Sequence, residues 1–195
     1  MKYPLSLQFK ILALAPQISV FDADGQIRFY VKQKAFKLKE AVSVFADEAQ
    51  TRLLYTMQAD RVIDWSARYR FRDATGNEIG SVKRQGMKSL WRSRYDIMRG
   101  EEVVATIQEE NPWVKVIDRL VGEIPIIGML TGYMFHPAYS VQRTGDNTVI
   151  MRAVKEPAFL QGKFRIEEKV NVPEEDEVRV ILSLFMMLLL ERLRG

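Results

Sequence analysis

The sequence contains no cysteine and a single histidine, His136. Without cysteine the chain can form no disulfide, no thiolate metal site and no thiol nucleophile. One histidine is too few for the usual histidine-based zinc sites, and nothing else in the sequence suggests a Ser-His-Asp triad. We interpret His136, which precedes Pro137, as a structural turn residue. The sequence therefore predicts a protein that is not an enzyme, with no catalytic residues, no cofactor and no metal. An unrecognised activity is the alternative, and it would require a deep pocket with convergent acidic or hydroxyl residues.

The sequence also lacks a hydrophobic run long enough to span a membrane, which takes about 20 residues. Its most apolar segment, residues 180–190, has Ser183 as its one polar residue. A helix that is apolar on every side must be buried. The acidic run 174–177 and the arginines near the C-terminus complement the dipole of such a helix. We therefore predict a buried helix over about 174–194. Insertion of this tail into lipid and a helix-mediated oligomer are the alternatives.

We also expect no secretion, because residues 1–6 are not followed by a long apolar core and a small-residue cleavage site. The formal net charge of +4 is too small to identify a partner by itself. The absence of cysteine fits a reducing cytosol. We expect a cytoplasmic protein, with peripheral association with the membrane as a further expectation. The sequence does not indicate the oligomeric state.

Most of the remaining chain reads as short β-branched and aromatic segments that are separated by turn signals such as Asp24-Gly25 and Thr75-Gly76. These segments lie at residues 7–14, 18–21, 26–31, 42–46, 53–57, 67–72, 79–83, 94–98, 103–108, 139–142, 149–153 and 163–168. Eight strands form a barrel that side chains alone fill, so a barrel around a helix about 10 Å wide needs more strands. The sequence predicts one mainly β domain (α+β by content) over residues 1–195. Its architecture is a closed barrel of roughly twelve strands around the C-terminal helix.

A second helix is predicted over residues 112–121, with Asn111 as its N-cap and Pro112 at its first position. The next segment, residues 122–135, is apolar but interrupted by proline and glycine. One interpretation is a loop or short helix that closes one mouth of the barrel. The other is an exposed apolar surface for a membrane or a protein partner.

The sequence contains an internal repeat with an offset of 51 residues. Asp22-Ala23-x-Gly25 matches Asp73-Ala74-x-Gly76, and Val31-Lys32 matches Val82-Lys83. This spacing predicts a duplicated β-meander. The first copy is not a calcium loop, because an EF-hand needs glutamate where this chain has Gln33.

The repeat continues into Lys88-Ser89-Leu90-Trp91, Tyr95 and Arg99-Gly100. In this order the motifs resemble the LURP-one-related family, which is related to phospholipid scramblases and to the C-terminal domain of Tubby proteins. The resemblance runs from about Gln17 to the C-terminus and suggests an unadorned, bacterial-type member. It implies a Tubby C-terminal-like barrel of about twelve strands around a hydrophobic C-terminal helix. Tubby relatives bind phosphoinositide head groups through basic residues, and scramblase relatives associate with membranes.

Two segments, 28–39 and 83–94, carry five basic residues each and no acidic residue before Glu40 and Asp96. Each lysine or arginine near anionic lipid contributes about 1 kcal/mol to binding. The predicted residues for anionic head groups are Lys32, Lys34, Lys37, Lys83, Arg84, Lys88 and Arg92.

Two interpretations of these basic segments remain open, together with one alternative function that uses another segment. The first is a non-enzymatic module that binds anionic phospholipid head groups, and the second is a solvated strand face whose charges discourage edge pairing. A protein-interaction or scaffold domain that uses residues 122–135 is the alternative function. Trp91 and Tyr95 are able to stack on bases, but no RNP-like or helix-turn-helix pattern accompanies them, so no nucleic-acid partner is expected.

Overall fold

The computed structural model describes residues 1–10, 15–34, 41–61, 67–85, 93–110, 137–157 and 162–192. These ranges contain β1 (Leu5–Phe9), β2 (Gln17–Phe21), β3 (Ile27–Gln33), β4 (Ala41–Phe45), β5 (Leu53–Ala59), β6 (Arg68–Asp73), β7 (Glu78–Arg84), β8 (Arg94–Arg99), β9 (Glu102–Glu109), β10 (Ala138–Arg143), β11 (Val149–Glu156), β12 (Lys163–Glu168) and helix α3 (Glu174–Arg192). Every predicted strand has a counterpart among them. The first strand begins at Leu5, earlier than predicted, because Leu5 already pairs with Ile166 of β12.

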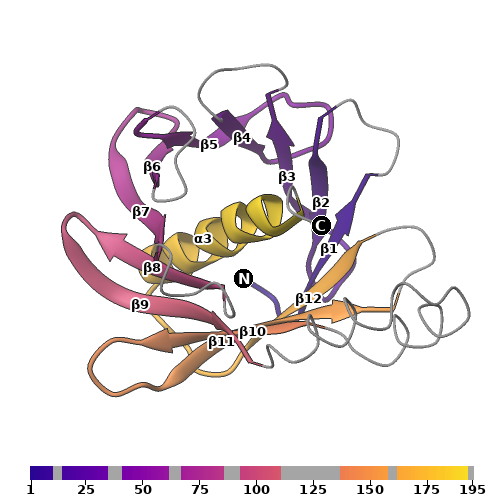
Figure 1. Ribbon diagram of the computed structural model, residues 1–195. Coiled ribbons are helices and arrows are strands. Elements are labelled where there is room, and N and C mark those ends of the chain that lie inside the picture. The colour runs from indigo at the N-terminus through magenta and orange to yellow at the C-terminus, as the bar shows by residue number, and fades with distance from the viewer. Residues whose placement is uncertain are drawn as a thin grey trace, which may run out of the picture.

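The strands form a closed antiparallel barrel in which neighbours in sequence are also neighbours in the sheet. β1 closes the ring, because Leu7 lies opposite both Val20 of β2 and Phe164 of β12. Figure 1 shows α3 inside the ring of strands. The prediction of a closed barrel of about twelve strands around a C-terminal helix is confirmed.

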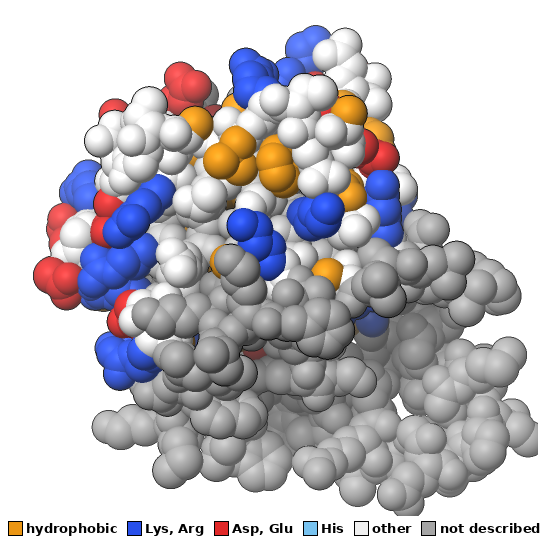
Figure 2. All heavy atoms as spheres, turned by 90° about the horizontal axis from the view of Figure 1, so that it is seen from above, with side chains coloured by type: hydrophobic (Ala, Val, Ile, Leu, Met, Phe, Trp, Pro, Cys, Tyr) orange, Lys and Arg blue, Asp and Glu red, His pale blue; other side chains and the backbone are white. Residues whose placement is uncertain are grey.

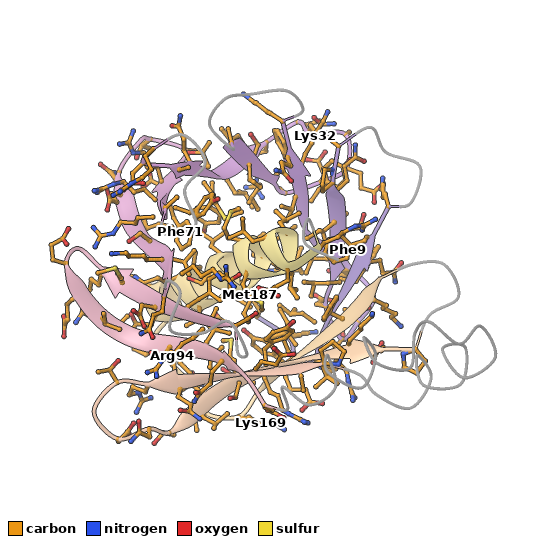
Figure 3. All side chains as sticks on the ribbon, viewed as in Figure 1. Phe9, Lys32, Phe71, Arg94, Lys169 and Met187 are labelled. Atoms are coloured by element: carbon orange, nitrogen blue, oxygen red, sulfur yellow. The ribbon has the colours of Figure 1, made fainter. Side chains whose placement is uncertain are left out.

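The walls of the barrel follow the alternation of side chains along a strand. On β1, Leu5, Leu7 and Phe9 are buried, whereas the two residues between them are half-buried on the outer side. Figure 3 shows Phe9 and Phe71 pointing from the wall toward α3, which carries Met187, while Lys32 points away from it. The inward side chains of the strands and the helix therefore share one core.

The apolar part of helix α3 is buried on every side, as its composition predicts. Each residue from 180 to 189 is at most 2% exposed. Phe185 packs edge-on against Phe29, with the ring centroids 5.7 Å apart. Complete burial of one such side chain contributes roughly 1.5–3 kcal/mol. Within the described ranges, no helix combines the length and the hydropathy that crossing a membrane requires.

The N-terminal end of α3 is held by its acidic first turn. Glu177 accepts a hydrogen bond of 2.9 Å from the Tyr3 hydroxyl, and Asp176 forms an ion pair with Arg179. These carboxylates also lie at the positive end of the helix dipole. The acidic run thus complements the helix dipole and anchors the helix to the N-terminal segment.

The C-terminal end of α3 is held by a cluster of hydroxyl groups. Glu191 accepts hydrogen bonds from the Tyr95 hydroxyl at 2.7 Å and from the Ser93 hydroxyl at 2.8 Å. Burial, followed by the charge of Glu191, raises the pKa of Tyr95 and of Tyr139 far above the usual range. These contacts set the depth of the helix in the barrel.

The two ends of the barrel differ in their connections. Because the strands are antiparallel, the short connections within residues 22–26, 46–52, 74–77, 100–101 and 144–148 lie at one end, together with the link from β12 to α3. We call this the turn end. We call the opposite end, where β1, β3, β5, β7, β9 and β11 end, the loop end. Residues 111–136, which contain the predicted second helix, residues 122–135 and His136, lie outside the described ranges.

The internal repeat appears as two equivalent hairpins. The Asp22 carboxylate accepts hydrogen bonds from the amides of Asp24 and Gln26, each at 3.0 Å. The Asp73 carboxylate does the same with the amides of residues 75 and 77, each at 2.9 Å. Gly25 and Gly76 follow with positive φ angles of 75° and 95°. The predicted duplication of the β2–β3 meander as β6–β7 is therefore present in the structure.

Candidate functional site

The structure describes part of the predicted basic set. Lys32 and Lys34 lie on and just after β3, and Lys83 and Arg84 end β7. Three further members, Lys37, Lys88 and Arg92, lie outside the described ranges. Both described pairs are near the loop end of their strands.

Lys32 points outward but is already engaged. Its Nζ donates to the Gln50 side chain at 3.2 Å, because the connection between β4 and β5 folds back over the outer face of β3. In the same connection Glu48 accepts hydrogen bonds from Lys10, at 2.9 Å, and from Ser19. These two partners hold the pKa of Glu48 below its usual range. An acidic side chain thus reduces the positive potential of this surface.

Lys83 and Arg84 lie on opposite faces of β7. Lys83 is exposed on the outer face, whereas Arg84 shares the inward orientation of Val82, which is fully buried. Arg84 lies opposite Tyr95, and its charge acts on the Tyr95 hydroxyl in the interior. Arg84 therefore lies beside the buried cluster at the C-terminus of α3, away from Lys83.

Strand order separates the two predicted groups further. Three strands, β4, β5 and β6, lie between β3 and β7 around the ring. Lys32 and Lys83 thus occupy equivalent positions in the repeat, one third of the circumference apart. Within the described ranges, the predicted residues do not form one cluster.

A different set of basic residues lies together on the outer face of β6. Arg68, Arg70 and Arg72 alternate with the buried Tyr69 and Phe71. Residues two apart on a strand lie about 7 Å from each other on one face. In the ladder Arg68 lies opposite Lys83 of β7, so this lysine extends the row. We call Arg68, Arg70, Arg72 and Lys83 the β6–β7 basic row.

Sequence reasoning missed three of these four residues, although a signal was present. The segment reads Arg68-Tyr69-Arg70-Phe71-Arg72, which is a period-two alternation of arginine and aromatic residues. Such a pattern places all the arginines on one face of a strand. The sequence predicts only a strand here, because the segment lies outside the two acid-free basic segments.

The members of the β6–β7 basic row differ in their counter-ions. Arg68 forms two hydrogen bonds with Glu101, at 2.6 and 2.9 Å, and Arg70 forms an ion pair with Glu78 at 3.0 Å. Neither Arg72 nor Lys83 has an ion pair or side-chain hydrogen bond with the part of the chain that the structure describes. Glu78 and Asp96 lie opposite Arg72 and Lys83 in the ladder, but neither forms an ion pair with its neighbour, so both cations remain available to an external anion.

A groove runs beside the row on the outer face of β5 and β6. Its volume is 420 Å³, and its lining consists of Thr56, Gln58, Ala59, Asp60, Arg70 and Arg72. Thr56 and Gln58 lie directly opposite the two arginines in the ladder, so hydroxyl and amide groups stand beside the guanidinium groups. This set of donors suits an anion with several oxygen atoms.

An apolar pair lies near this groove. Phe45 of β4 and Leu53 of β5 are directly paired, and Leu53 is 37% exposed. Figure 2 shows this side of the barrel, where lysine and arginine side chains surround a few exposed hydrophobic ones. Basic and apolar groups therefore share one outer surface.

Three further hollows lie at the turn end, around the N-terminus of α3. One of them has a volume of 710 Å³, and Tyr55, Asp73, Glu78, Glu174 and Glu175 contribute to its lining. Its carboxylates outnumber its arginines, Arg99 and Arg179, so it is a poor site for an anion. In the described ranges, no three acidic or histidine side chains come together as metal ligands.

Comparison with known proteins gives one result at the level of the family. Residues 27–188 match the family model described as LURP-one-related. No curated protein matches the chain, and no solved structure matches it.

Proposed function

The chain belongs to the LURP-one-related family, and from this premise we propose that it is a non-enzymatic module that binds anionic phospholipid head groups at the membrane surface. The proposed site is the β6–β7 basic row with the adjoining groove. The observation that carries the proposal is Arg72, which lines the groove and forms no ion pair or side-chain hydrogen bond in the described ranges.

The chemistry of the groove supports this proposal. An arginine side chain can bind two phosphate oxygens at once, and the hydrogen bonds to a charged acceptor are about twice as strong as neutral ones. Arg70 and Arg72 are arranged to act together, since they are two residues apart on one face. Thr56 and Gln58 supply hydrogen bonds to the remaining oxygens.

The surroundings of the groove support a membrane as the source of the phosphate. The exposed Leu53 and its partner Phe45 lie on the same outer surface, where they can enter the head-group layer. Such a module approaches the bilayer with the outside of its wall, while α3 stays in the core. Binding of this kind is peripheral.

The test is co-sedimentation with phosphatidylcholine vesicles and with vesicles that also contain phosphatidylserine. The protein should bind the acidic vesicles more strongly, and added salt should weaken this binding. Arg72→Gln and Lys83→Gln should each lower the affinity about fivefold, which corresponds to about 1 kcal/mol. The control is Lys155→Gln, which removes one exposed charge from β11 on another part of the ring.

Equal and weak sedimentation with both kinds of vesicle at low ionic strength would contradict the proposal. An equal loss in all three variants would show that only the total charge matters. The protein-interaction function based on residues 122–135 stays a prediction, since that segment lies outside the described ranges.

A further inference from the structure

We infer that Arg68 and its neighbours form a phosphate-binding site that is occupied by the protein's own Glu101, and that an external phosphate binds by displacing this carboxylate. The inference deepens the proposed function, because it assigns the regulation of the β6–β7 basic row. It depends on the proposed function only for the identification of a lipid as the source of the phosphate. The site chemistry itself also admits a free phosphate.

The contact between Arg68 and Glu101 has the geometry of anion recognition. Both terminal nitrogens of Arg68 donate to Glu101, with Nη1 to Oε1 at 2.6 Å and Nη2 to Oε2 at 2.9 Å. This paired arrangement is the one by which arginine binds either a carboxylate or two oxygens of a phosphate. The structure thus contains an occupied anion site on the outer face of the barrel.

The charges around Glu101 extend the site. Lys83 lies opposite Arg68, and Arg70 is the next outward residue of β6. Their positive charges add to that of Arg68, whose hydrogen bonds are the main reason why the pKa of Glu101 lies below its usual range. Three cations therefore act on Glu101, while the carboxylates of Asp60 and Glu78 also act on Arg68. A phosphate monoester, with its larger negative charge, matches this environment better than a single carboxylate does.

The two partners differ strongly in exposure. The Arg68 side chain is 11% exposed, whereas the Glu101 side chain is 83% exposed. Arg68 also contacts the Met98 sulfur, so its guanidinium lies against the wall of the barrel. If Glu101 left without replacement, a nearly buried positive charge would lose its counter-ion, which is costly. Exchange of Glu101 for another anion avoids this cost.

The position of Glu101 allows such an exchange. It belongs to the short connection between β8 and β9, next to Gly100, which has a φ of 58°. Because the Glu101 carboxylate is already largely exposed to water, its release from the ion pair costs it little free energy. Movement of this connection would leave the β6 wall in place and uncover Arg68 together with Lys83.

The test compares Glu101→Gln with the neighbouring Glu102→Gln. Both variants remove one exposed negative charge, but Glu102 pairs with Arg99 instead of Arg68. Isothermal titration calorimetry would use phosphatidic acid vesicles as one ligand and inorganic pyrophosphate as the other. Removing the internal competitor should raise affinity about three- to tenfold in Glu101→Gln, because more of the protein is competent to bind. In Glu102→Gln the change should stay below about twofold.

Arg68→Lys supplies a second measurement. It keeps the charge but loses the paired hydrogen bonds, so it should weaken binding. When Arg68→Lys is present, adding Glu101→Gln should no longer raise the affinity. Circular dichroism checks that each variant is folded. If Arg68→Lys does not fold, the comparison of the two glutamate variants decides the question.

The outcomes separate this inference from the proposed function. Equal gains in both glutamate variants, or no gain in Glu101→Gln, would overturn the inference even if the wild-type protein binds acidic vesicles. A gain with pyrophosphate in the absence of any vesicle binding would support the phosphate site and contradict the lipid-binding function. A gain with vesicles alone would identify the lipid head group as the source. No binding of either ligand by any variant would refute both.

Discussion

The side chain of Arg179 on α3 passes so close to Gly80 of β7 that no other residue fits there. A Cβ atom at position 80 would lie 2.8 Å from Cγ, Cδ and Nε of Arg179. Arg179 cannot easily move away, because its Nε donates to the Ile79 carbonyl at 2.8 Å and the side chain pairs with Asp176. Gly80 thus allows a buried arginine to join the helix to the wall of the barrel.

We expect Gly80→Ala to lower the free energy of unfolding by about 2 kcal/mol or more, since the added methyl group overpacks a rigid contact. The φ of 152° at this position adds strain for any side chain. Urea denaturation measures the effect. The control is Gly76→Ala, where φ is also positive but a Cβ atom meets no atom within 4 Å. Its cost should be near 1 kcal/mol, and equal costs at the two positions would contradict the contact as the cause.

We expect Leu184→Asp to abolish folding. Leu184 is fully buried in α3. Burying an unpaired carboxylate in the core costs more free energy than the typical free energy of unfolding of a whole domain. The control, Leu184→Met, conserves volume and should cost less than about 1.5 kcal/mol. Far-UV circular dichroism and thermal unfolding measure both variants. A folded Leu184→Asp protein would show that α3 is not the central element of the core.

Stability should decline at alkaline pH because of buried tyrosines. Burial raises the pKa of Tyr95 and Tyr139 above the unfolded value of about 10. The folded state therefore retains these protons while the unfolded state loses them, so the stabilisation is complete below pH 10 and decreases as the pH rises above it. Urea midpoints and tyrosinate absorbance follow the change. Tyr139→Phe should flatten the decline, and titration of these tyrosines near pH 10 in a folded protein would contradict the prediction.

The absence of cysteine allows one labelled site at a time. In the proposed orientation, an environment-sensitive fluorophore on Leu53→Cys should shift to the blue when acidic vesicles are added, because Leu53 is exposed beside the groove. The same label on Lys155→Cys, on a distant part of the wall, should not shift. A shift at position 155 without one at position 53 would mean that another face of the barrel contacts the bilayer.

Local patterns in the sequence were sufficient for the architecture. The helix at Glu174–Arg192 was predictable because residues 180–190 are apolar on all sides yet too few to span a membrane. The strands were predictable because short alternating segments lie between turn residues such as Gly25 and Gly76. The closed ring followed from these two facts, since a helix of this kind needs a wall around it.

The candidate site needed the tertiary structure, because charge patterns along a chain do not specify which face a residue occupies. Lys83 and Arg84 are adjacent in sequence, yet the strand directs one outward and the other into the interior. The three arginines of β6 share one face with Lys83 only because β6 and β7 pair in a particular register.

Side-chain contacts between residues far apart in the sequence could not be predicted from the sequence either. Arg68 and Glu101 are 33 residues apart, and their pairing depends on how the connection after β8 folds over the wall. Gly80 and Arg179 are separated further, and they meet only when the helix enters the closed barrel. Composition and periodicity therefore determined the elements and the core of this protein. Strand register and the folding of the connections decided which charges meet, because those depend on contacts between distant segments.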